Sequence, residues 1–249
     1  SGGKGLAVAD TLTGGDGIHG IPRTFICELP DGTRKVFDSR EDIPAGAKAI
    51  VDPNTYYPSH VATDFYHHWK EDIALFAEMG MNVYRLSINW TRIFPNGDDE
   101  QPNEEGLVFY ENVFKECHKY GIEPLVTINH FDCPMYLIKK IGGWRSREMM
   151  DYFYKLCKTL FIRYKGLVKY WLTFNEINMI LHFPFVAAGL CFEEGENETQ
   201  AMITAVHHQL LASAMATKLA HEIDSNNQIG CMLAAGSYYP ETCKPEDYW

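Results

Sequence analysis

The sequence predicts an α/β protein built on a parallel sheet, and two observations carry that prediction. Short runs of β-forming residues alternate with amphipathic helical stretches, which is the order that βαβ units produce. The run Tyr170–Phe174 is apolar almost throughout and contains neither Gly nor Pro. Such a run is typical of a buried parallel strand covered on both faces.

Two polar residues follow that strand directly, and they are the centre of the functional interpretation. Asn175 supplies an amide and Glu176 a carboxylate. In a parallel α/β barrel the carboxyl ends of the strands carry the chemistry, so a polar pair at this position indicates a catalytic site. Taken alone, Glu176 could equally be an ion-paired carboxylate that ends a strand.

The first 62 residues are predicted to be irregular. They are rich in Gly around 14–20, and Pro and charged residues are scattered through 30–60. A loop of this length without helical or strand periodicity is usually functional or a connector. From about residue 63 the pattern becomes regular.

Apolar residues at helical spacing predict helices at about 63–79, 104–119, 147–164 and 199–222. In the first of these, Phe65, Trp69 and Ile73 recur on one face, and Gly80 is the expected stop. Predicted strands lie between the helices, at 82–88, 123–129, 170–174 and 228–235. We expect the connections between them to be right-handed crossovers.

The strand count sets the predicted architecture. A (β/α)8 TIM barrel has eight strands and needs about 250 residues. This chain has 249 residues, but only about four strands can be found. We therefore expect 1–249 to form a single, partial TIM-barrel domain, with its βα units beginning at about residue 63.

Composition excludes two classes of partner. The net charge of −11 argues against nucleic acid, whose phosphates require a basic surface. No apolar run approaches the roughly 20 residues needed to cross a membrane. An anionic small molecule stays possible, because a local pocket can oppose the net charge.

The cysteines indicate a reducing compartment. There are seven, an odd number, and none forms a C-x-x-C pair, which favours free thiols in the cytoplasm over disulfides or a zinc site. The first residues lack the apolar core of a signal peptide. The two adjacent histidine pairs, 67–68 and 207–208, diverge on helices, so we predict no metal site.

Short motifs across nearly the whole chain carry a resemblance to a known family. They are Tyr-Pro-Ser-His at 57–60, Asp-Phe-Tyr-His at 64–67, Lys-Glu-Asp-Ile-Ala-Leu at 70–75, Tyr-Arg-Leu-Ser-Ile-Asn-Trp at 84–90, Arg-Ile-Phe-Pro at 92–95, His-Phe-Asp at 130–132, Gly-Gly-Trp at 142–144 and Thr-Phe-Asn-Glu-Ile-Asn at 173–178. With these motifs the chain resembles glycoside hydrolase family 1, and within it the bacterial 6-phospho-β-glucosidases.

The resemblance implies a role for each residue that matches a family motif. Glu176 matches the general acid/base, and Asn175 matches the residue that binds the sugar 2-hydroxyl. His130 matches a residue that contacts ring hydroxyls, and Arg85 a basic residue that keeps the nucleophilic carboxylate ionised. Alone, His130 and Arg85 would be structural; their joint placement at predicted strand ends favours function.

Three further residues lie near the site in the family, with weaker roles. They are Asp132, Asn178 and Trp144. Phe131 favours the phospho-sugar branch, because related enzymes acting on unphosphorylated sugars usually carry Trp at that position. The implied substrate is therefore a small phosphorylated β-glucoside.

The implied reaction is double displacement. One carboxyl group attacks C1 while the other protonates the leaving oxygen and then deprotonates water, with the two groups about 5–5.5 Å apart. A negative nucleophile close by helps to keep the acid protonated. No metal or organic cofactor is implied.

Parts of the family pattern are not found, and the nucleophile is the most important of them. The family's Glu-Asn-Gly tripeptide does not occur, and the similar Glu-Gly-Glu-Asn at 194–197 falls in a predicted loop before a helix. The first strand and the phosphate-binding loop of the family are not matched either. We therefore expect a fragment of a longer enzyme, inactive by itself, whose partner is the other half of the barrel.

The alternative functions belong to different classes of protein. One is a catalytically inactive fragment or a carbohydrate-binding half-barrel that needs a partner half. Another is a β-glucosidase or 6-phospho-β-galactosidase of the same family. An unrelated aldolase-like barrel is least favoured. It would require a Lys nucleophile at the end of a strand, and none of the four predicted strands ends in Lys.

Overall fold

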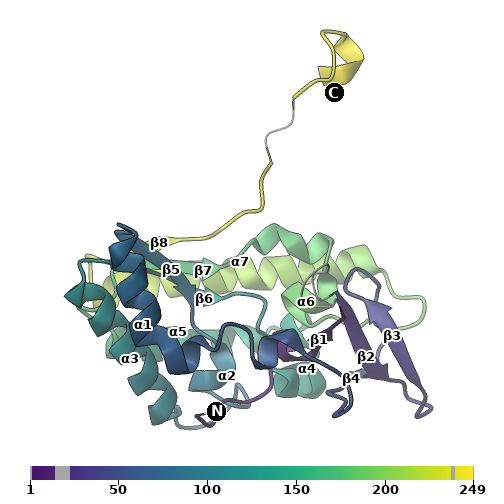
Figure 1. The fold of residues 1–249 in the computed structure, drawn as a ribbon. Helices are drawn as coiled ribbons and strands as arrows, with labels where there is room; N and C mark the ends of the chain where they lie inside the picture. The colour runs from purple at the N-terminus through teal and green to yellow at the C-terminus, as the bar shows by residue number, and fades with distance from the viewer. Residues whose placement is uncertain (1, 15–22, 237–238, 249) are drawn as a thin grey trace.

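The computed structural model describes residues 2–14, 23–236 and 239–248, and it contains two sheets at opposite ends of the body (Figure 1). One sheet is parallel and lies among the long helices. The other is antiparallel and is built from the N-terminal segment. The candidate site belongs to the parallel sheet.

The parallel sheet has the predicted four strands. They are β5 (Val83–Ser87), β6 (Glu123–Asn129), β7 (Tyr170–Phe174) and β8 (Gln228–Gly230), hydrogen-bonded in the order β5-β6-β7-β8 with every pair parallel. The fourth strand is shorter than predicted, because regular pairing ends at Gly230. Among the described residues the sheet does not close into a barrel.

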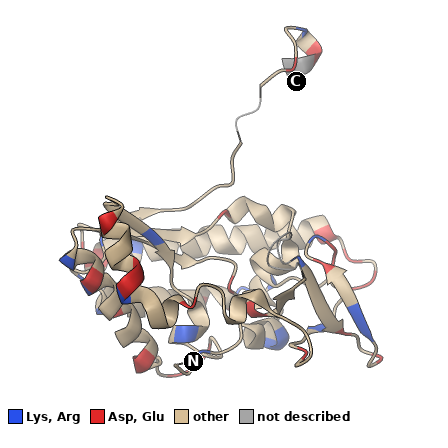
Figure 2. Ribbon diagram, in the orientation of Figure 1, with Lys and Arg blue, Asp and Glu red and all other residues tan. Residues whose placement is uncertain are grey.

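The four long helices also lie where periodicity predicts them. They are α1 (Phe65–Glu78), α3 (Glu104–Lys119), α5 (Met149–Arg163) and α7 (Glu198–Ile223). The apolar stripe of α3 is buried, as Val113 and Phe114 show with no exposed surface. Figure 2 colours several charged positions on α1 and α3 but very few on α7. α7 packs against α5 and the short helices η3 and η4.

Short helices occupy several segments outside the predicted long helices and strands. They are α2 (Trp90–Ile93), α4 (Met135–Ile141), α6 (Pro184–Ala188), η1 (Val8–Thr11), η2 (Pro58–His60), η3 (Gly143–Arg145), η4 (Ile177–Leu181) and η5 (Pro245–Tyr248). Each is too short for helical periodicity to be recognised. Two of them, α2 and η4, directly follow the ends of β5 and β7 and therefore shape the site.

The prediction that 1–62 is irregular is wrong. Its described residues form an antiparallel sheet of β1 (Leu12–Thr13), β2 (Thr24–Glu28), β3 (Arg34–Asp38) and β4 (Lys48–Ala49). The alternation of buried and half-buried residues in β2, with Phe25 and Cys27 fully buried, spans only five residues and is easily overlooked. Gly32 supplies the positive φ of 82° in the β2–β3 turn. Residues 15–22 of the segment lie outside the described residues.

The prediction that β7 is covered on both faces is also wrong. Trp171 faces α5 and is 1% exposed, whereas Tyr170 on the opposite face is 37% exposed. Arg85 of β5 shares that open face and is exposed as well. The reason is topological: helices cover only the outer face, and the inner face of a barrel is buried by other strands of the same barrel.

The C-terminal residues leave the body of the molecule in an extended path (Figure 1). Before they do so, Met232 and Ala234 still hydrogen-bond to the segment that follows β7. A search of the described residues finds no helix with the length and apolar character that a membrane span requires.

Candidate active site

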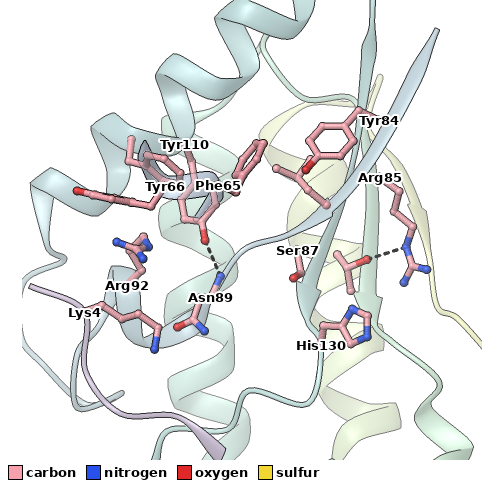
Figure 3. Close-up of a pocket in the computed structure, with 13 residues that line it drawn as sticks. Lys4, Phe65, Tyr66, Tyr84, Arg85, Ser87, Asn89, Arg92, Tyr110 and His130 are labelled. Atoms are coloured by element: carbon pink, nitrogen blue, oxygen red, sulfur yellow. Dashed lines mark hydrogen bonds between the residues drawn. The ribbon is translucent and has the colours of Figure 1, made fainter. Parts of the chain in front are cut away.

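The predicted site residues gather at the carboxyl ends of neighbouring strands. Asn175 and Glu176 follow β7, and His130 follows β6. Arg85 lies within β5, and its side chain extends along the inner face of the sheet toward the same end (Figure 3). The parallel order of β5, β6 and β7 is what brings these residues together.

Glu176 is held in a backbone conformation that is rare for a residue with a side chain. Its φ and ψ are 37° and 56°, in the left-handed region, and the residue is half-buried. That conformation costs a non-glycine residue roughly 1–2 kcal/mol, and such strain concentrates at functional sites. Within the part of the chain that the structure describes, no hydrogen bond or ion pair involves the Glu176 carboxylate.

Arg85 connects the site across the sheet. Its Nε donates to Thr127 Oγ1 of β6 at 3.2 Å, and its guanidinium donates to Asn175 Oδ1 at 2.6 Å. Because Oδ1 of Asn175 accepts from Arg85, the Nδ2 group is the part of this amide that can donate to a ligand. Asn175 is 5% exposed, and because a guanidinium can only donate, the amide atom that faces Arg85 is the oxygen.

His130 lies at the edge of the open face. Its backbone N–H donates to Asp132 Oδ1 at 3.3 Å, and its ring contacts the edge of Phe131 at a centroid distance of 5.5 Å. Partial desolvation and, second, the positive charge of Arg85 lower the pKa of the imidazole. His130 is therefore expected to be neutral at pH 7, able both to donate and to accept a hydrogen bond.

Asp132 is a structural residue in this structure. It is 4% exposed, and its Oδ2 accepts from the backbone N–H of Trp90 at 2.8 Å while Oδ1 accepts from His130. Burial raises the pKa of the carboxyl to about 7, although these backbone hydrogen bonds act in the opposite direction. Through these hydrogen bonds the carboxyl group joins the loop that follows β5 to the loop that follows β6.

Trp144 and Asn178 both lie at the end of β7. Trp144 has no exposed surface and packs edge-on against Phe174. The ring thus supports the end of β7 from the helix side. Asn178 uses its amide to bind the backbone of Ala234, at 2.9 Å for each of two hydrogen bonds. Both residues act on the position of the β7 end.

A cavity of about 500 Å³ lies along the edge of β5 (Figure 3). Arg85 and His130 form part of its lining, together with Lys4 and Arg92. Glu176 and Asn175 do not line it. The polar residues at the end of β7 and the cavity at the edge of β5 are therefore adjacent, and Arg85 and His130 belong to both.

Sequence reasoning missed two polar residues of β6. Thr127 is fully buried and accepts from Arg85. Asn129 is 3% exposed, its carbonyl accepts from the Asn175 N–H at 2.9 Å, and its Nδ2 has no partner among the described residues. The available signal was a pair of polar residues near the end of an otherwise apolar strand, directly before His130.

No group of His, Cys, Asp or Glu side chains in the described ranges is arranged to hold a metal ion. The described site therefore consists of one carboxylic acid, one amide, one imidazole and one guanidinium. These groups can donate and accept hydrogen bonds around a hydroxylated ligand and can transfer a proton.

A parallel βαβ sheet with an Asn-Glu pair after one strand and His and Arg on its neighbours is the arrangement of a strand-end site in an α/β barrel. The chain belongs to glycosyl hydrolase family 1, whose family model matches residues 47–249. It is 53% identical over 248 residues to the 6-phospho-beta-glucosidase AscB of Escherichia coli, covering all of this chain and 48% of AscB. It is 49% identical over 246 residues to the aryl-phospho-beta-D-glucosidase BglH of Bacillus subtilis, covering 99% of this chain and 46% of BglH.

Solved structures agree with the assignment. The family 1 β-glucosidase of Thermotoga maritima superposes with a TM-score of 0.72 at 30% identity, over all of this chain and 47% of that enzyme. The chain thus spans about half the length of the relatives it matches. The expected (β/α)8 family is confirmed, and among the described residues the parallel sheet has four strands, as expected.

Proposed function

We propose that this chain supplies the acid–base half of the active site of a retaining β-glycosidase that hydrolyses 6-phospho-β-D-glucosides. The observation that carries the proposal is the placement of Glu176. It lies at the carboxyl end of β7 in a left-handed conformation, next to an Asn175 amide that Arg85 orients. Glu176 has a strained backbone and lies beside an amide of fixed orientation. Both features are expected of a catalytic carboxylate that must approach the sugar in one defined geometry.

The proposed roles follow from the groups. Glu176 protonates the leaving oxygen and afterwards deprotonates the attacking water. Asn175 donates its Nδ2–H to the sugar 2-hydroxyl, an interaction that strengthens in the oxocarbenium-like transition state. His130, held neutral by partial desolvation and by Arg85, binds ring hydroxyls.

The nucleophile is proposed to come from the rest of a longer chain. Arg85 is the described cation on the inner face that contacts Asn175, and its charge would help to keep a carboxylate ionised on the opposite side of the sugar. A retaining reaction needs that carboxylate about 5–5.5 Å from Glu176. By itself the 249-residue chain is expected to be inactive.

The phosphorylated substrate class rests on two supports. Relatives that are 53% and 49% identical carry phospho-β-glucosidase names. Phe131 is the second support, because the family resemblance implies Trp at this position in enzymes that act on unphosphorylated sugars. We place the reaction in the cytoplasm, which agrees with the free state of all seven cysteines.

The test joins this chain to the part of AscB that lies outside the matched segment. We expect the fusion to release p-nitrophenol from p-nitrophenyl β-glucoside 6-phosphate, and the chain alone to release none. Glu176→Ala in the fusion should lower kcat by roughly 10²- to 10⁴-fold, the usual contribution of a general acid–base group. Azide, which needs no general base, should then restore turnover by forming a glycosyl azide.

Glu222→Ala is the matched control, because Glu222 is an exposed carboxylate on α7 far along the chain from the site. It should leave kcat unchanged. Full activity of the Glu176→Ala fusion without azide would refute the acid–base assignment. Faster hydrolysis of the unphosphorylated glucoside would instead favour a β-glucosidase and refute the phospho-sugar assignment.

A further inference from the structure

The hydrogen-bond ladder between β7 and β8 continues beyond the ends of both strands. Regular pairing ends where Leu172 meets Gly230. Past that point Met232 N–H donates to Phe174 O at 3.0 Å, and Ile177 N–H donates to Met232 O at 3.0 Å. These two bonds span Glu176, which lies between Phe174 and Ile177 in the chain.

The next step of the ladder uses a side chain. After Glu176 the backbone turns into η4, so its own peptide groups are directed along that helix. Asn178 takes their place: Nδ2 donates to Ala234 O, and Oδ1 accepts from Ala234 N–H, both at 2.9 Å. A carboxamide has the same donor and acceptor as a peptide group, so it can form this two-point contact with a strand.

We propose that Asn178 is a positioning residue for Glu176, an inference that rests on the function proposed above. The left-handed backbone of Glu176 is unfavourable and persists only if the flanking residues hold it. On the β6 side, Asn175 N–H donates to Asn129 O at 2.9 Å. On the β8 side, the bonds of Ile177 and Asn178 hold the chain that leaves Glu176.

The contact also couples two strand ends. Residues 232–234 follow β8, and Asn178 binds them to the loop that carries the acid. A shift of the segment after β8 would therefore be transmitted to Glu176 through two parallel hydrogen bonds. Asn178 thereby affects the reaction through the direction of the Glu176 carboxylate, without touching the sugar.

The test uses the 249-residue chain, amide hydrogen exchange and the ¹³Cα chemical shift of Glu176, which reports its φ and ψ. In Asn178→Ala, protection of the Ile177 and Ala234 amides should fall by about 5- to 30-fold, the effect of losing one or two kcal/mol. The Glu176 shift should move toward the value of ordinary extended or helical backbone. In Asn178→Asp, the retained acceptor should keep Ala234 protected although the donor to Ala234 O is lost.

Two controls separate positioning from general destabilisation. Protection at Leu172 and Gly230, lower in the same ladder, should be unchanged in both variants. Ser213→Ala removes the 2.7 Å contact with Thr173 Oγ1 on the helix side of β7 and should leave the Glu176 shift unaltered. An unchanged Glu176 shift and unchanged Ile177 protection in Asn178→Ala would overturn the proposal. Because neither readout involves hydrolysis, that failure is distinguishable from failure of the proposed function.

Discussion

Arg85 and Asn175 contact each other although their strands are not neighbours. The Arg85 guanidinium of β5 passes over Thr127 of β6 and donates a 2.6 Å hydrogen bond to Asn175 Oδ1, just after β7. One side chain thus connects three strands on the open face of the sheet. It also determines which end of the Asn175 amide is available to a ligand.

This contact should be measurable as a coupling free energy. We expect a double-mutant cycle of Arg85→Met and Asn175→Ala, followed by urea unfolding, to give a coupling of about 1 kcal/mol. The value lies below that of buried charged hydrogen bonds because Arg85 is exposed to solvent. Arg147 is an exposed arginine just before α5, and no side-chain contact joins it to Asn175 among the described residues. The control pair, Arg147→Met with Asn175→Ala, should therefore show no coupling. A zero result for the first pair would mean that the contact does not form in solution.

The Arg85 charge should also be visible in the titration of His130. Partial desolvation is the larger cause of its lowered pKa, and Arg85 the second. We expect NMR titration of the ring to show a higher pKa in Arg85→Met than in the parent chain, yet still below the ordinary value, because the desolvation persists. Arg147→Met should not change it. A pKa that is unaffected by Arg85→Met would contradict the proposed electrostatic contact.

The buried carboxyl of Asp132 should make stability depend on pH. Its pKa is about 7 in the folded chain, against an ordinary value near 3.9 when unfolded. Between these values the folded state binds the proton more tightly, so the free energy of unfolding should fall as pH rises from about 4 to 7. Unfolding at several pH values should show this slope in the parent chain. Its persistence in Asp132→Asn would assign the slope to another group.

Strain at Glu176 predicts an unusual effect of glycine. Because the φ of 37° favours a residue without Cβ, Glu176→Gly should be more stable to urea than Glu176→Ala by about 1 kcal/mol. At an exposed helical position the sign should reverse, and Ala214→Gly on α7 should destabilise by about 1 kcal/mol. Equal stability of the two Glu176 variants would mean that the left-handed conformation is not retained.

Local periodicity was sufficient to predict the regular framework. The α3 stripe of Leu107, Tyr110 and Val113 and the run Tyr170–Phe174 are complete within one helix or one strand. Their boundaries therefore agree closely with the structure. The same reasoning failed for β2, where five alternating residues stand between a Gly-rich segment and a charged turn.

Some site residues could likewise be placed from the sequence, and others could be placed only from the structure. The sequence by itself determined that Glu176, Asn175 and His130 lie at strand ends, because each directly follows a recognisable strand. Only the tertiary structure decided that Trp144 is buried beneath the site, and that Asn178 binds Ala234, 56 residues away. The Arg85–Asn175 bond joins residues 90 positions apart. Such contacts depend on how strands and helices pack in three dimensions. Sequence periodicity indicates only whether a segment forms a helix or a strand and which of its faces is apolar.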